Sequence, residues 1–361
     1  MRKTTKFRNN ERIGSLQGLR GIGFLCVCTG HCTLTKLGAF GVSLFFVLSG
    51  FLLTYRNAED EIPCSLKSGI QFSINRIKRL YPLHILTMLS LVLYIKIMQN
   101  MIQWKMIVFN SFLIQSWIPD MSVYFSLNGV SWYLSACVFI YAVFPLMLSF
   151  IRRTSKHSIA FIFCIYLCQV LTGIGSILDP VQRLFDNPDM VHWITYICPL
   201  FRFGDFVIGG YLGYSFAHIR SETINKRIVS AAECITIIIF VLIQYMCEHN
   251  ICIWQYEVFK NTLCYTPLAA AFVFLFATEK GMVSRFLTWH PLVSLGNISA
   301  YTFLIHYAVI PYLRTILVGV LGLTLDPWVL FLFTLGISCA CAEIYIKLEK
   351  SVNCWISTTD Q

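Results

Sequence analysis

An arginine and a histidine stand eleven positions apart in the first apolar stretch of the chain, LRGIGFLCVCTGH, residues 19–31. At about 100° per residue this separation is three helical turns plus about 20°, so Arg20 and His31 share one helix face. The rise between them is about 16 Å, near half the hydrocarbon thickness of a bilayer. Charged side chains inside membrane spans usually mark a pathway or a site, and a neutral imidazole can act as a general base. The structural alternative is a snorkelling arginine and a histidine just past the helix end.

Three further polar residues could bind an anionic or polar ligand. Arg76 and Arg79, in NRIKRLYP, are one helical turn apart, and two guanidinium groups at that spacing can clamp a phosphate or diphosphate. The alternative is that both belong to the ordinary positive charge beside a membrane span. Ser49 lies deep in the aromatic stretch GVSLFFVLSGF, where a serine bonded back to its own helix is the simplest interpretation.

Two pairs of polar residues occur later in the chain. Arg202 and Asp205, in LFRFGDFVIGG, are three positions apart, and a structural ion pair and a substrate site explain them equally well. Ser299 and His306, in SLGNISAYTFLIH, are seven apart and share a helix face, although His306 could also be a packing histidine at a helix end. The spacing of Gly209 and Gly213 favours close helix packing.

The composition indicates which elements must hold these residues. Hydrophobic residues make up 57% of the 361 residues, charged residues only 13%, and the mean hydropathy is +0.67. A soluble domain is about one quarter charged, so a soluble core does not explain so apolar a chain. The sequence therefore predicts an all-α fold, a polytopic membrane helical bundle. No H-E-x-x-H, P-loop or G-x-S-x-G motif is present, so we expect no metal, no ATP-driven transport and no classical serine hydrolase.

We predict about ten transmembrane helices of adequate length. They cover roughly 14–34, 37–55, 80–98, 131–150, 158–177, 196–217, 228–247, 262–278, 292–316 and 327–347. An eleventh apolar stretch, 104–118, is short for a span. Lysines and arginines concentrate on one side only if this stretch enters and leaves on the same face, with both termini cytoplasmic. We therefore expect a short re-entrant or interfacial helix there.

This topology also accounts for the net charge of +10, which leaves no concentrated patch for nucleic acid. We expect residues 1–361 to form a single membrane domain, with cytoplasmic tails at 1–13 and 348–361. The sequence gives no sign of oligomeric state.

Taken in order, these segments resemble the acyltransferase-3 family of integral membrane acyltransferases. The family shows an arginine, ten residues and a histidine in its first span, then a G-V-x-x-F-F-V-L-S-G-F span and an R-x-x-R-x-x-P loop. The matching segments are Arg20 to His31, GVSLFFVLSGF at 41–51 and RIKRLYP at 76–82, with weaker matches at SWYLSACVFIYAVFP, RFGDFVIG, GNISAYTFLIH and KLEKS.

The resemblance implies an O-acetyltransferase of the bacterial inner membrane that modifies a cell-envelope polysaccharide. Acetyl-CoA, or another acyl-CoA, would be the donor substrate, with no permanently bound cofactor, and a glycan or other hydroxyl compound would be the acceptor. His31 would be the general base, and Arg20 would be a second catalytic residue. The donor would be held by Arg20, Ser49, Arg76 and Arg79, and the acceptor by Trp132, Arg202, Asp205, Ser299, Tyr301 and His306.

Three positions depart from the family pattern. Cys137 stands where the family commonly has a glutamate, and Ala300 and Phe303 replace two tyrosines of the late S-Y-x-x-Y-L-x-H segment. A transporter or flippase of lipid-linked sugars is the alternative function, because many spans and buried charges also suit it. A membrane sensor or scaffold is a third hypothesis, in which Arg20 and His31 only pack.

Overall fold

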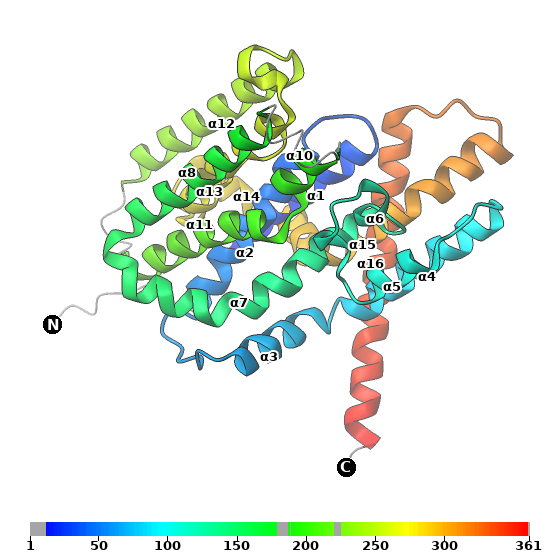
Figure 1. The fold of residues 1–361 in the computed structure, drawn as a ribbon, viewed down its shortest axis with the longest axis horizontal. Helices are drawn as coiled ribbons and strands as arrows, with labels where there is room; N and C mark the ends of the chain where they lie inside the picture. Colours follow the sequence, from blue (N-terminus) through cyan, green and yellow to red (C-terminus); the bar gives the residue numbers. More distant parts are fainter. Residues whose placement is uncertain (1–11, 179–186, 188, 220–224, 360–361) are drawn as a thin grey trace.

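The computed structural model describes residues 12–178, 187, 189–219 and 225–359, and these form helices joined by short turns, with no strand among them. The expected tail at 1–13 lies almost entirely outside the described residues. In chain order the helices are α1 Gly14–His31, α2 Gly38–Arg56, α3 Leu66–Ile77, α4 Tyr81–Ile97, α5 Trp104–Ser111, α6 Met121–Tyr124, α7 Trp132–Thr154, α8 Ser158–Ser176, α10 Met190–His192, α11 Pro199–His218, α12 Lys226–Glu248, α13 Tyr265–Ala277, α14 Met282–Leu287, α15 His290–Arg314 and α16 Pro327–Thr359 (Figure 1).

Every predicted span coincides with a helix of this bundle. Judged by length and apolarity within the described residues, six helical runs can cross a membrane, or seven if the bent pair α3–α4 counts as one. One of the six, Gly129–Ser176, contains both α7 and α8. The chain is therefore a multi-pass membrane helical bundle. The short stretch at 104–118 holds α5, whose eight residues rise about 12 Å, too little to cross the hydrocarbon core.

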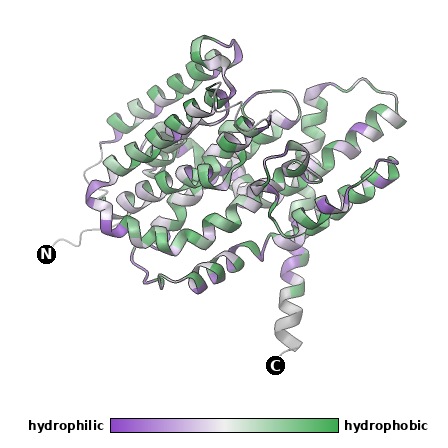
Figure 2. Cartoon of the chain, in the orientation of Figure 1, coloured by the Kyte–Doolittle hydropathy of each residue, from purple (hydrophilic) through white to green (hydrophobic). Residues whose placement is uncertain are grey.

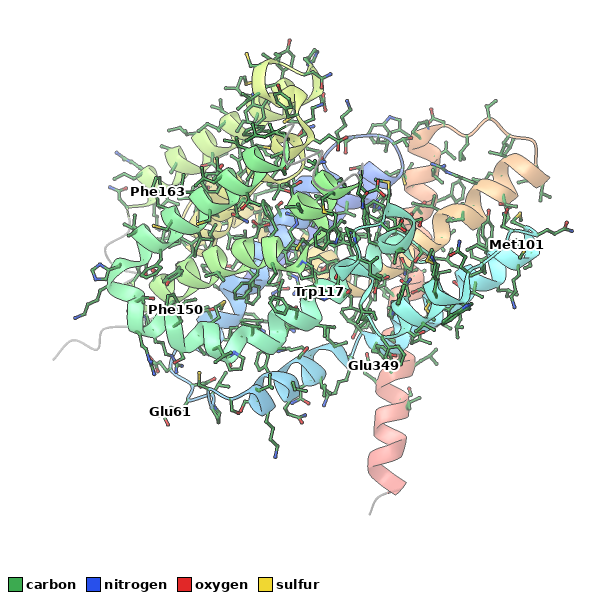
Figure 3. All side chains as sticks on the ribbon, in the orientation of Figure 1. Glu61, Met101, Trp117, Phe150, Phe163 and Glu349 are labelled. Atoms are coloured by element: carbon green, nitrogen blue, oxygen red, sulfur yellow. The ribbon has the colours of Figure 1, made fainter. Side chains whose placement is uncertain are left out.

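Hydrophobic residues occur throughout the helices of the bundle (Figure 2), and many of the large ones are exposed at its surface. Figure 3 labels several of them, among which Met101 is 95% and Phe163 63% exposed. Helix α12 carries a row of exposed isoleucine, leucine and valine residues. Apolar surface of this extent is expected where lipid, not water, is the solvent.

Glycines allow the central helices to meet at backbone distance. A Cβ atom at Gly209 of α11 would lie 2.0 Å from the Val47 carbonyl oxygen of α2, and one at Gly50 would lie 1.9 Å from the Phe206 carbonyl oxygen. On α15, a Cβ at Gly296 would lie 1.8 Å from the carbonyl oxygen of Gln17 in α1. The close packing predicted from the glycine spacing of α11 is thus confirmed, and any side chain at these positions would push the helices apart.

Helix α3 lies between the predicted spans at 37–55 and 80–98, in a segment where we predicted no helix. Its N-terminus is capped by Ser65, whose hydroxyl accepts a hydrogen bond from the Ser68 amide at 3.2 Å. The helix packs on α7, where Ser73 Oγ donates to the Val138 carbonyl at 2.8 Å. This contact places Arg76, near the end of α3, over the centre of the bundle.

Helix α16 continues past the predicted span through 348–359, where a tail was expected. In Figure 1 its C-terminal part projects beyond the rest of the bundle.

Candidate active site

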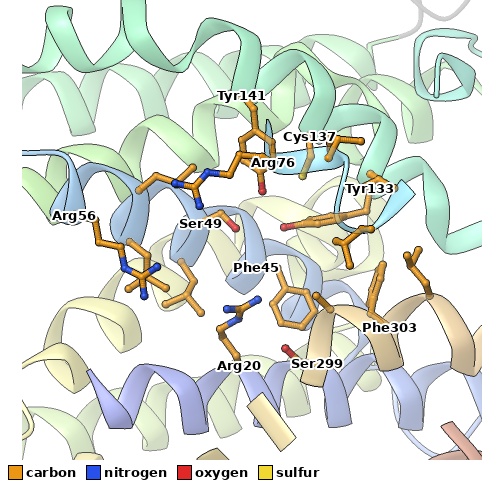
Figure 4. Close-up of a pocket in the computed structure, with 18 residues that line it drawn as sticks. Arg20, Phe45, Ser49, Arg56, Arg76, Tyr133, Cys137, Tyr141, Ser299 and Phe303 are labelled. Carbon is orange, nitrogen blue, oxygen red and sulfur yellow. The ribbon is translucent and has the colours of Figure 1, made fainter. Parts of the chain in front are cut away.

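A cavity of about 200 Å³ opens between α1, α2, α3, α7 and α15, and three guanidinium groups point into it (Figure 4). They belong to Arg20, Arg56 and Arg76, and no carboxylate of the described residues lines the same space. We call it the arginine cavity. Arg56 repels both of the other cations electrostatically. Three like charges without a counter-charge suit a polyanionic ligand such as a chain of phosphates.

Small polar groups complete the lining of the arginine cavity. Ser49 and Tyr133 both line it, and Figure 4 shows the two side chains facing each other. Ser299 also lines it, with Oγ donating to the Gly296 carbonyl at 2.8 Å. On α7, Cys137 lines it together with Tyr133 and Tyr141, which lie one turn before and one turn after it. These groups give the cavity several hydrogen-bonding partners for an uncharged, polar part of a ligand.

Arg79 and Tyr301 lie in a different cluster, outside the lining of the arginine cavity. Arg79 Nε donates to the Tyr301 hydroxyl at 2.5 Å, and that hydroxyl donates to Glu349 Oε2 at 3.0 Å. Arg79 is also 3.9 Å from the Glu349 carboxylate. The cluster ties α16 to α15 and to the turn between α3 and α4. The structure therefore separates Arg79 from Arg76 and favours a structural role for Arg79 and Tyr301.

His31, the last residue of α1, and His306 of α15 form a direct pair. His31 Nδ1 and His306 Nε2 are 2.8 Å apart, and His306 Nδ1 is 3.2 Å from the Thr302 carbonyl oxygen. A carbonyl can only accept, so His306 Nδ1 carries the proton and its Nε2 accepts from Nδ1–H of His31. The hydrogen bonds therefore assign the tautomers of both rings, and Nε2 of His31 carries no proton. No hydrogen bond to that nitrogen exists among the described residues.

His31 lines a second cavity, of about 460 Å³, which we call the histidine cavity. Aromatic rings dominate its wall, among them Trp132, Tyr196 and Tyr307, and the same wall contains Lys36. Such a surface suits a sugar-like or otherwise amphipathic ligand, which stacks on rings and hydrogen bonds at its edges. His192 also lines it, and burial lowers the pKa of its imidazole. Trp132, expected to bind the acceptor, thus lines the same cavity as His31.

Arg202 and Asp205 form an ion pair of 2.9 Å in which both side chains are fully buried. Arg202 Nε donates to the Tyr196 carbonyl at 2.7 Å, and its guanidinium lies 4.6 Å from the centre of the Tyr196 ring. Asp205 accepts from Gln169 and Thr266 at 2.9 and 2.8 Å. Neither residue lines the arginine cavity or the histidine cavity. The pair supports the wall of the histidine cavity from behind, and this placement favours the structural interpretation.

The sequence of residues 13–345 matches the acyltransferase domain family known as acyltransferase-3. The chain belongs to this family. The match covers all three groups described above: the arginine cavity, the histidine pair and the buried ion pair.

Two curated proteins are similar to this family member. "Acyltransferase MdmB" of Streptomyces mycarofaciens is 31% identical over 163 residues, which cover 39% of this chain and 41% of that protein. "Putative peptidoglycan O-acetyltransferase YrhL" of Bacillus subtilis (strain 168) is 24% identical over 335 residues, which cover 84% of this chain and 50% of that protein. The chain thus spans half or less of the length of these relatives. No solved structure matches it significantly.

The structure adds residues to the site that sequence reasoning missed. The sequence patterns did not single out Arg56, yet it follows Ser49 by seven positions, a spacing that places both on one face of α2. The two tyrosines beside Cys137 follow the same logic, since Tyr133 and Tyr141 are each four positions away from it. Helical spacing from a residue already suspected could have found all three. Within the described residues, no three histidine, cysteine or acidic side chains gather to hold a metal.

Proposed function

We propose that the protein transfers an acyl group, specifically acetyl, from acyl-CoA to a hydroxyl group of a cell-envelope glycan. The observation that carries the proposal is the placement of two cavities at opposite ends of α1. One contains three unpaired guanidinium groups, and the other contains an imidazole whose Nε2 is free. A polyanionic donor and a hydroxyl acceptor require these two environments.

The arginine cavity suits the phosphates of coenzyme A. Arg56 and Arg76 come from the end of α2 and of α3, whereas Arg20 lies further into the bundle. The phosphates would be held by the first two residues, and the acyl-bearing arm would extend past Arg20 and Ser49 towards the histidine pair.

In the proposed step His31 Nε2 takes the proton of the acceptor hydroxyl as its oxygen attacks the thioester carbonyl carbon. The new ester C–O bond forms, the C–S bond breaks, and the sulfur leaves with the proton as the thiol of coenzyme A. His306 acts as a positioning residue, because its Nε2 accepts the Nδ1 proton of His31 and so keeps Nε2 of His31 unprotonated. General base catalysis of this kind typically contributes about 10²–10⁴-fold.

The finer topology belongs to the same proposal. Ten spans, with both termini cytoplasmic, would place the arginine cavity towards the cytoplasm, where acyl-CoA is available, and the histidine cavity towards the outside. This arrangement fits the inner membrane of a bacterium. Peptidoglycan, which the name of the Bacillus subtilis relative contains, is the first acceptor to test.

The test uses the purified protein in lipid vesicles, with acetyl-CoA as donor and muropeptides as acceptor. We expect acceptor-dependent release of free coenzyme A, matched by acetyl ester on the muropeptides. His31→Ala should lower this release by at least 100-fold. His157→Ala, at an exposed histidine between α7 and α8, is the matched control and should retain wild-type activity.

Two outcomes would contradict the proposal. Coenzyme A release that persists in His31→Ala would remove this residue from the chemistry. Movement of a lipid-linked sugar across the vesicle membrane without acyl-CoA, together with no acyl transfer, would support the transporter alternative.

A further inference from the structure

Three aromatic rings from three helices meet between the arginine cavity and the histidine cavity. Phe45 of α2, Tyr133 of α7 and Phe303 of α15 form a closed triangle. The ring centroids are 6.2 Å apart for Phe45–Tyr133, 5.9 Å for Phe45–Phe303 and 5.6 Å for Tyr133–Phe303. Each pair meets edge to face, an arrangement that aromatic rings prefer when packed. We call this group the aromatic septum.

The position of the septum follows from which space each ring lines. All three rings line the arginine cavity, where Figure 4 shows them gathered near Ser299. Phe303 alone of the three also lines the histidine cavity. Its ring centroid lies 5.8 Å from that of His306, the partner of His31. A group that moves from the arginine cavity to the histidine pair therefore passes this ring.

The rings are held in place by their neighbours. The Tyr133 ring packs 4.5 Å from the Phe46 ring, centroid to centroid. Phe303 is only 7% exposed. Side chains packed in this way resist displacement, so any opening between them has a defined size.

We propose that the aromatic septum selects the length of the acyl group and keeps water from the thioester, an inference that rests on the proposed function. The acetyl group is small enough to reach His31 beside the rings, whereas each added methylene must displace one. In an apolar pocket one methylene changes the rate by about 10–200-fold. When no acceptor is bound, the rings also keep water of the histidine cavity from attacking the acyl carbon and releasing the thiol.

The first experiment measures acyl preference. Release of coenzyme A to muropeptides is compared for acetyl-, propionyl-, butyryl- and hexanoyl-CoA. We expect the wild type to prefer acetyl-CoA and Phe303→Ala to improve use of butyryl-CoA relative to acetyl-CoA by at least 10-fold. Release without acceptor should also rise in this variant.

Two further variants separate selection from damage. Phe272→Ala removes a ring of similar exposure, 5%, from α13, where it lines neither cavity, and should leave the preference unchanged. Phe303→Leu tests the same position with a smaller loss of packing and should shift the preference in the same direction. An unchanged preference in both Phe303 variants, with the wild type active on acetyl-CoA, would overturn the septum proposal alone.

The second experiment does not depend on activity. Cys137 lines the arginine cavity beside Tyr133, so it reports whether a reagent passes the septum. An anionic methanethiosulfonate is applied from the side of the histidine cavity, and modified cysteines are mapped by peptide mass spectrometry. We expect Cys137 to be protected in the wild type and modified in Phe303→Ala. Equal modification in both would show that the cavities are already connected, and would overturn the proposal even if acyl transfer occurs.

Discussion

The arginine cavity and the histidine cavity lie at two ends of α1 and differ in their chemistry. The first collects three guanidinium groups with no carboxylate in its lining, whereas the second combines aromatic rings with the free Nε2 of His31. A cation close to the histidine pair would oppose the positive charge that a general base gains, and the described lining of the histidine cavity contains one, Lys36, but no arginine. The fold keeps its three unpaired arginines away from the base.

The largest effect is expected on stability, where the buried ion pair of Arg202 and Asp205 contrasts with the arginines of the arginine cavity. Arg202→Met should leave Asp205 as an unpaired buried charge and lower stability by about 3–5 kcal/mol. Arg56→Met removes a cation that has only like charges nearby, so it should leave stability unchanged or slightly raised. Thermal unfolding in detergent checks both, and equal destabilisation would contradict the distinction between paired and unpaired arginines.

The next largest effect is expected at His306, the hydrogen-bond partner of His31. His306→Ala removes the acceptor for Nδ1–H of His31, and we expect kcat to fall by about 100-fold with little change in the KM for acetyl-CoA. His306→Gln, whose amide oxygen can accept the same proton, should recover part of the loss. A fall in kcat that is the same in both variants would indicate that His306 only packs.

Substitutions in the arginine cavity should change KM instead of kcat. Arg56→Met and Arg76→Met should each raise the KM for acetyl-CoA by about 10-fold, the equivalent of one charge-assisted hydrogen bond, while kcat changes little. Added salt should weaken donor binding in the wild type more than in either variant. Wild-type KM values in both variants would show that coenzyme A binds elsewhere.

The smallest effect is expected from the cluster at α16. Arg79→Met should change the KM for acetyl-CoA less than twofold, because Arg79 bonds to Tyr301 and lies outside the arginine cavity. Exposed ion pairs contribute about 0–1 kcal/mol, so stability should fall only slightly. A 10-fold rise in KM would restore the phosphate clamp that the sequence predicted for Arg76 and Arg79 together.

The sequence was most informative where one physical rule applies to a long segment. Apolar runs long enough to span a bilayer located the main helices, and the eleven-residue spacing of Arg20 and His31 placed both on one helix face. Helix α3 was missed because its short amphipathic run lies in a stretch otherwise marked by charge. Helix α3 ends at Ile77, so it carries Arg76 to the arginine cavity, whereas Arg79 lies in the turn after the helix and outside the cavity lining.

The pairing of side chains from distant helices was beyond single-sequence reasoning. His31 and His306 are 275 positions apart, and both had been noted separately, but nothing local predicts their 2.8 Å contact. The same holds for Tyr301, which the pattern placed with the acceptor and the structure places beside Glu349. Tertiary packing decides which members of a set of suspected residues meet.

The glycine contacts between the central helices have a consequence for the speed of catalysis. Helices α1 and α15, like α2 and α11, touch backbone to backbone, so neither pair can slide without a clash. Tyr133 reaches Phe45 and Phe303 from α7 through its ring alone. Passage between the two cavities would then need movement of side chains only, and not a collective helix movement, which takes microseconds to milliseconds. The turnover rate of such an enzyme would be limited by the chemical step or by product release, and not by helix movement.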